Sequence, residues 1–68
     1  MLVFMYLKRL KDLREDHDLT QQQVADLIHC RREVYRRYET GVRELPVSYA
    51  VILANYYKVS LDYLVGLE

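Results

Sequence analysis

The chain is poor in the residues that cross-link a fold or bind metals. Its 68 residues include one cysteine (Cys30), two histidines and no tryptophan. A single cysteine excludes an intrachain disulfide and is typical of a reducing compartment. These residues also offer no zinc-ligand spacing, and the sequence shows neither a nucleophile–base pair nor a phosphate-binding glycine loop. We therefore expect no metal, no cofactor and no enzymatic activity.

Long hydrophobic runs are also missing. The longest apolar run covers residues 1–7 and ends at Lys8 and Arg9, whereas a transmembrane helix needs about 20 apolar residues. No basic segment precedes the run, so it does not resemble a signal peptide. We expect one domain over residues 1–68, located in the cytoplasm and not at a membrane. The chain is too short for a ligand-binding domain as well, so no small-molecule ligand is expected.

Neither sign of charge is in excess, because ten basic residues balance ten acidic ones. A net charge of zero disfavours a polyanionic partner when it is taken alone. The distribution of charge argues the other way, since five arginines and only two glutamates lie between His29 and Arg43. A basic face on a neutral protein is typical of nucleic-acid binding.

Apolar residues recur at helical spacing in five stretches, and no stretch alternates with the two-residue period of a strand. The pattern predicts an all-α fold with five short helices around one core. The first helix covers about three turns and ends near His17. The positions expected to face inward are Leu7, Leu10, Leu13, Val24, Leu27, Ile28, Tyr35, Tyr38, Val47, Ala50, Val51, Ala54, Tyr57, Leu61, Leu64 and Val65.

The helix ends are marked by residues with known capping roles. Thr20 and Gln23 fit a capping box at the start of the second helix. A break at His29 and Cys30 separates it from a third helix over about residues 32–39. The remaining boundary residues are Gly41 after the third helix, Pro46 in the first turn of the fourth, and Ser60 and Gly66 around the fifth.

Several motifs occur in a fixed order over residues 7–66. They are Leu10-x-x-Leu13-Arg14, Leu19-Thr20-Gln21, Ala25, Tyr35-x-x-Tyr38-Glu39-x-Gly41 and Val59-Ser60-Leu61-Asp62-Tyr63-Leu64. With these motifs the chain resembles the phage repressor/Cro-like (Xre-type) helix-turn-helix family of DNA-binding domains. The resemblance implies a lambda-repressor-like fold, with the helix-turn-helix formed by the second and third helices over residues 20–39.

Three positions depart from the family pattern at the turn. His29 stands where the family usually has glycine, Cys30 where it has valine or isoleucine, and Arg31 where it has serine or threonine. If His29 adopts a positive φ, strain of about 1 kcal/mol is expected. Cys30 is expected to fill a small core position. Arg31 lacks the hydroxyl of the usual cap, but its charge can replace a phosphate contact.

The third helix carries the expected base contacts. With Tyr35 and Tyr38 inward, helical spacing places Glu33, Arg36 and Arg37 on the opposite side, with Arg32 beside them. By resemblance, Arg32, Glu33 and Arg37 read base edges and Arg36 lies close by. Arginine can donate two bonds to guanine and glutamate can accept one from cytosine. The alternative is a solvated face with no DNA contact.

Other residues are expected to bind phosphates or to support the helices. The resemblance implies a phosphate contact by Gln21. The proposed phosphate contacts are Gln21, Gln22, Arg31 and Arg43. Ordinary surface roles remain the alternative for these residues. By the same resemblance, Arg14 and Glu39 form an ion pair that sets the angle of the third helix.

These features predict a sequence-specific transcriptional regulator of double-stranded DNA, a repressor that binds a palindromic operator as a homodimer. Ile52, Tyr56 and Leu67 are one candidate dimer surface. Residues 1–7 are a second, although they can instead pack on the fifth helix. The alternative function is an antitoxin-like or adaptor module whose main partner is a protein that docks on residues 1–7.

Overall fold

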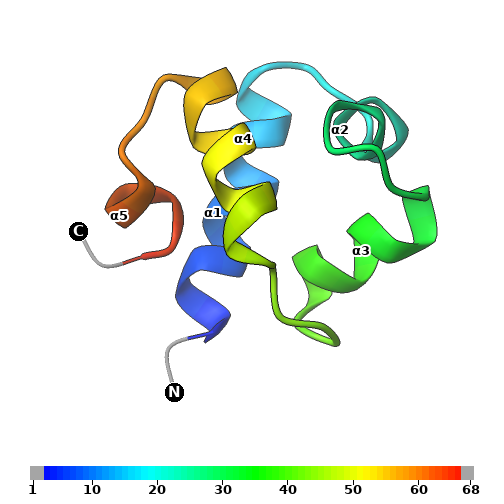
Figure 1. Cartoon of the computed structure of the whole chain (residues 1–68), viewed down its shortest axis with the longest axis horizontal. Coiled ribbons are helices and arrows are strands. Elements are labelled where there is room, and N and C mark those ends of the chain that lie inside the picture. The colour runs from blue at the N-terminus through cyan, green and yellow to red at the C-terminus, as the bar shows by residue number, and fades with distance from the viewer. Residues whose placement is uncertain (1–2, 67–68) are drawn as a thin grey trace.

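Five helices make up the fold of residues 3–66. A computed structural model describes residues 3–66, with side chains from residue 8 onward. The helices are α1 (Val3–Asp16), α2 (Gln21–Leu27), α3 (Arg32–Thr40), α4 (Val47–Tyr57) and α5 (Leu61–Leu64). No strand occurs between residues 3 and 66, and the all-α prediction is confirmed. In Figure 1, α1 and α4 overlap at the centre of the view, α2 and α3 lie to one side and α5 lies to the other.

All five helices contribute to one hydrophobic core. Its buried members are Leu10, Leu13, Val24, Ala25, Ile28, Tyr35, Tyr38, Leu45, Ala50, Leu53, Ala54, Tyr57 and Leu64. Removal of this apolar surface from water is the main force that holds short helices together. Ala25 is fully buried, and its small side chain lets α3 approach α2 closely.

The buried face of α4 differs from the predicted one. Three of the five predicted positions are buried, but Val47 is 71% exposed and Val51 is 42% exposed. Leu53, which was not predicted, is fully buried. The helical period alone fits either stripe, and only contact with the other helices selects one. Val47 lies in the first turn of α4, at an open groove between α4 and α5.

Smaller differences concern the edges of the core and the length of α1. Leu61 is 37% exposed, and Leu27 is only partly buried, because each lies at the rim of its helix's inward face. α1 has 14 residues and ends at Asp16, so it is about one turn longer than predicted. The side chain of Leu7 lies outside the described residues.

The predicted helix starts are observed with their hydrogen bonds. The hydroxyl of Thr20 accepts from the backbone N–H of Gln23 at 3.0 Å, and the side chain of Gln23 accepts from the N–H of Thr20 at 2.8 Å. This reciprocal pair is a capping box and satisfies two free amides at the start of α2. Ser60 caps α5 by accepting from the N–H of Tyr63 at 3.0 Å. Pro46 is the N-cap of α4, one position earlier than predicted.

Three helices end in left-handed backbone without using glycine. Asp18, His29 and Lys58 have φ values of 54°, 57° and 58°, respectively. At the end of α2, the N–H of Cys30 donates to the carbonyl of Ala25 at 3.0 Å, and that of His29 donates to Asp26 at 3.2 Å. These two bonds form a Schellman motif, in which the residue with positive φ is usually glycine. His29 therefore adopts the positive φ on which the expected strain depends.

Replacing His29 with glycine tests the strain at this turn. We expect His29→Gly to leave stability unchanged or to raise it by up to about 1 kcal/mol, because glycine removes the Cβ clash but adds freedom to the unfolded chain. His29→Ala, which keeps the Cβ, is the control and is expected to give no gain. Urea denaturation measures both variants. A loss above about 1 kcal/mol in His29→Gly would contradict this account of the turn.

Candidate nucleic-acid interface

A tight turn joins α2 to α3. The turn covers residues 28–31, and the positive φ of His29 redirects the chain within it. Cys30 packs against the core, and burial raises the pKa of its thiol. Figure 1 shows α2 nearly along its axis while α3 lies across the view, so the two helices meet at a steep angle.

The inward face of α3 is formed by Tyr35, Tyr38 and Glu39, which are spaced at i, i+3 and i+4. Tyr35 is fully buried and Tyr38 is 5% exposed, while the side chain of Glu39 is 4% exposed. The ring of Tyr38 meets that of Tyr49 on α4 edge-on, with a centroid distance of 6.1 Å. Burial of these side chains decides which face of α3 is left for solvent.

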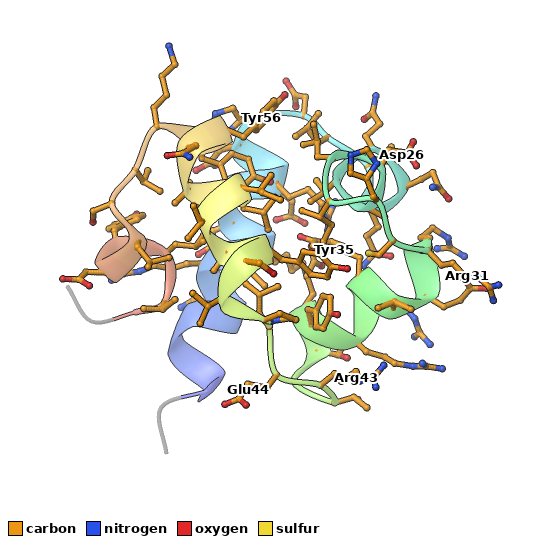
Figure 2. All side chains as sticks on the ribbon, viewed as in Figure 1. Asp26, Arg31, Tyr35, Arg43, Glu44 and Tyr56 are labelled. Atoms are coloured by element: carbon orange, nitrogen blue, oxygen red, sulfur yellow. The ribbon has the colours of Figure 1, made fainter. Side chains whose placement is uncertain are left out.

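The outward face of α3 carries Arg32, Glu33, Arg36 and Arg37, and all four residues are exposed. Among residues 8–66, none of these arginines forms a side-chain hydrogen bond or an ion pair. Glu33 and Arg37 are one turn apart but do not pair. Figure 2 shows nitrogen-tipped side chains along α3 directed away from the body of the domain. The face therefore carries three arginines and one glutamate, and none of the three arginines is paired with a carboxylate among residues 8–66.

Arg31 and Arg43 lie at the two ends of α3, as labelled in Figure 2, and both are exposed. Arg31 occupies the N-cap position, where its side chain forms no capping bond. The N–H of Arg43 donates to the carbonyl of Arg37 at 3.1 Å, which ties the following loop to the end of α3. The basic surface thus extends beyond both ends of the helix.

Gln21 and Gln22 begin α2, and their side chains point to different partners. The Gln21 amide donates to Oε1 of Glu39 at 3.2 Å, and Gln21 is partly buried. The Gln22 amide donates to Oδ1 of Asp26, one turn along the same helix, at 2.9 Å. Gln22 is exposed. Only Gln21 is connected to α3.

Arg14 and Glu39 form an ion pair between α1 and α3. Nε of Arg14 lies 2.6 Å from Oε2 of Glu39, and Nη2 lies 3.3 Å from Oε1. Nη1 of Arg14 donates to the carbonyl of Leu19 at 3.0 Å. The guanidinium thus contacts both α3 and the turn after α1. Such a two-point contact fixes an angle as well as a distance.

The surroundings of the pair shift the pKa of Glu39 in opposite directions. Burial alone raises the pKa of Glu39, but the Arg14 guanidinium, the Tyr35 hydroxyl and the Gln21 amide outweigh it, and the net pKa is lowered. Burial is the main cause that raises the pKa of Tyr35 and brings that of Tyr57 to about 12, and the nearby Glu39 carboxylate raises both further. Within the described part of the chain, neither tyrosine hydroxyl has a hydrogen-bond partner. The Tyr35 hydroxyl therefore lowers the pKa of Glu39 because it lies close to the carboxylate.

The described residues contain no group of three or more side chains suited to hold a metal ion. A membrane-spanning helix is likewise absent from that part of the chain, because none of its helices is both long and apolar enough.

Comparison with known protein families shows which family this arrangement of helices belongs to. A family model described as helix-turn-helix matches residues 10–64. The chain belongs to this family, in its Xre-type group. The steep α2–α3 pair and the turn at residues 28–31 form its helix-turn-helix, so the expected use of the second and third helices is confirmed.

Relatives of this helix-turn-helix chain include regulators from several bacteria. The HTH-type transcriptional regulator YobD of Bacillus subtilis is 43% identical over 93% of the chain and 56% of its own length. The cryptic phage CTXphi transcriptional repressor RstR of Vibrio cholerae is 33% identical, covering 91% of the chain and 56% of RstR. A transcriptional regulator from Listeria innocua has a similar structure, with a TM-score of 0.86 at 28% identity over 90% of this chain and 57% of that one. The chain therefore spans about half the length of these relatives.

The inward hydrogen bond of Gln21 was not expected from the sequence. Gln21 and Glu39 are 18 residues apart and lie on different helices. No local spacing relates them, so only the packing of α2 on α3 reveals the contact. The one available signal was indirect, because both residues belong to the motifs that carry the family resemblance.

Removing Glu39 is expected to destabilise the fold more than removing an outward arginine. Glu39→Ala leaves Arg14, whose side chain is 13% exposed, without its partner, and we expect a loss of about 3 kcal/mol. Arg32→Ala removes an exposed charge and is expected to stay within about 0.5 kcal/mol of the unmodified protein. Chemical denaturation compares the two. Equal midpoints would contradict a supporting role for the pair.

Acid is expected to weaken the fold through Glu39. Its pKa in the folded protein is below the ordinary value of 4.5, so its stabilising effect is complete above about pH 4.5 and is lost as the pH falls through the folded-state pKa. Thermal melts from about pH 6 to pH 2 measure this loss. Glu39→Gln is the control, and its stability deficit should shrink toward low pH. A deficit that does not change with pH would show that the ionised carboxylate contributes no stability.

Proposed function

We propose that this chain binds double-stranded DNA in a sequence-specific way and regulates transcription, acting as a repressor. One observation carries the proposal: the outward face of α3 presents arginines that have no counter-ion among the described residues. Such a face is unfavourable in water because like charges repel, and a polyanion relieves the repulsion. In a helix-turn-helix, the second helix enters the major groove.

Base edges are read by Arg32, Glu33, Arg36 and Arg37 in this proposal. Arginine donates two parallel bonds to O6 and N7 of guanine, and Glu33 accepts from N4 of cytosine. Each half-site is therefore expected to contain G·C pairs. Val34, which is partly buried and packs against the edge of the core, is proposed to touch a thymine methyl group with its exposed part.

Phosphates are held by Gln21, Gln22, Arg31 and Arg43. The start of α2 adds its free backbone amides and the positive end of its dipole, which favour an anion. Arg31 and Arg43 lie at opposite ends of α3, so their phosphate contacts would fix where α3 sits along the groove. These contacts give affinity and register, while α3 gives sequence discrimination.

Two copies of the chain are proposed to bind one palindromic operator. The two recognition helices then lie about 34 Å apart on one face of the DNA. Ile52 and Tyr56 are 40% and 43% exposed on α4 and remain a candidate contact between the copies. Leu67 and the side chains of residues 1–7 lie outside the described residues. A dimer on the operator represses by covering DNA that a polymerase needs, and this action takes place in the cytoplasm.

A protein partner is the second candidate function. The antitoxin PezA of Streptococcus pneumoniae is 34% identical over 87% of this chain, which covers 37% of PezA. An antitoxin-like or adaptor role would use the same fold with a protein as the main ligand. It predicts that exposed arginines on α3 can be removed without affecting the activity.

Alanine substitution of Arg32 or Arg37 tests the regulatory proposal. Selection from genomic fragments, followed by footprinting, first identifies a bound site. Arg32→Ala and Arg37→Ala are each expected to lose about 1–3 kcal/mol of discrimination between this site and a site with the contacted base pair changed. Affinity should also fall as salt rises, because counter-ions are released on binding.

Lys11→Ala is the matched control for this test. Lys11 is an exposed cation on α1, outside the helix-turn-helix, so its removal is expected to leave discrimination unchanged. If the arginine variants keep full discrimination, α3 does not read bases. If no genomic fragment is selected at all, the adaptor function is favoured.

A further inference from the structure

Glu39 joins three helices through one carboxylate. It belongs to α3, accepts from Arg14 on α1 through both oxygens, and accepts from Gln21 on α2 through Oε1. The side chain is 4% exposed, so these bonds are shielded from water. The carboxylate therefore connects the helix that carries the arginines with the first residue of the helix before it.

This contact determines which way the Gln21 amide points. An ionised carboxylate can only accept hydrogen bonds, so the nitrogen of the amide must face it. That nitrogen carries two hydrogens, and Glu39 takes one of them. The second hydrogen remains as a donor at the start of α2. A free glutamine side chain would instead sample many rotamers and present oxygen as often as nitrogen.

Gln22 provides an internal comparison. Its amide donates to Asp26 on the same helix at 2.9 Å, and the residue is exposed. This contact holds Gln22 along α2 and makes no connection to α3. Gln21 and Gln22 have the same side chain and are adjacent in sequence, but their amides donate to carboxylates on different helices.

We infer that Glu39 is a positioning residue for the phosphate contact of Gln21: it holds the amide so that the second N–H of Nε2 is presented to a DNA phosphate. The inference rests on the proposed function, because it concerns how that interface is built. Fixing the donor before binding reduces the ordering that binding would otherwise require. The same carboxylate then links the phosphate contact of α2 to the base-reading position of α3.

Ethylation interference tests the role, because an ethyl group on a phosphate weakens binding where the protein contacts that phosphate. The selected operator is ethylated at random, and the fraction bound at fixed salt is mapped. Gln21→Ala is expected to lower operator affinity about fivefold, which is the size expected for one neutral hydrogen bond, and to abolish interference at one phosphate in each half-site. A residue with a purely structural role would change stability without abolishing interference at that phosphate.

The decisive variant removes the acceptor without leaving a buried charge. Arg14→Met combined with Glu39→Met replaces the ion pair with apolar side chains, a change that buried pairs often tolerate. It is expected to lower operator affinity and to abolish interference at the same phosphate as Gln21→Ala does. Adding Gln21→Ala to this double variant should produce no further change, whereas adding Gln22→Ala should abolish interference at a different phosphate.

Two conservative variants complete the test. Glu39→Gln keeps an oxygen that can accept from Gln21, so we expect lower stability with interference retained at the Gln21 phosphate. Glu39→Asp keeps the charge but withdraws the acceptor by one methylene, and we expect interference at that phosphate to weaken. Glu39→Asp also serves if the methionine variant does not fold. All measurements are made at a temperature at which each variant is folded.

The outcomes separate this inference from the proposed function. A methionine variant, or Glu39→Asp, that keeps full interference at the phosphate lost in Gln21→Ala would overturn the positioning role. Unchanged affinity and unchanged interference in Gln21→Ala would also overturn it, yet the regulatory function would stand if Arg32→Ala still loses discrimination. If the unmodified protein selects no DNA, both proposals fail together.

Discussion

The burial of one face of α3 is the constraint on which the rest of the structure depends. Tyr35, Tyr38 and Glu39 turn inward together, and the fully buried ring of Tyr35 leaves little freedom for rotation of the helix. A rotation of one residue, about 100°, would bring a guanidinium into the core and expose a tyrosine. The two tyrosines supply the apolar contact, and Glu39 adds a direction, because its carboxylate must meet Arg14. The outward position of the arginines follows from this burial.

A buried carboxylate is an unusual choice for so small a core. Apolar side chains of similar size would fill the same space without the desolvation cost of two charges. The ion pair differs from apolar contacts in one respect. Its hydrogen bonds form together only at one arrangement of α1 and α3. Its link to Gln21 extends that arrangement to α2. In a domain whose helices are short, three bonds to a single carboxylate define the angle between elements more sharply than apolar contact does.

The scarcity of glycine has a visible consequence at the helix ends. Asp18, His29 and Lys58 adopt the left-handed backbone that glycine usually provides, and each one costs conformational energy. Asp18 and Lys58 end α1 and α4, whereas His29 lies within the helix-turn-helix, where the turn sets how α3 leaves α2. Backbone hydrogen bonds back into the preceding helix hold these turns in place.

The sequence by itself determined the number and approximate bounds of the helices, the capping box at Thr20 and the inward face of α3. These features are local, because helical period and capping act over three or four residues. It did not determine that α4 buries Leu53 and exposes Val47, since one period fits both stripes. It also did not reveal that Gln21 bonds to Glu39, because the two residues lie on different helices. Only the tertiary structure decided these points, because each depends on how separate helices pack and not on the order of residues within any one of them.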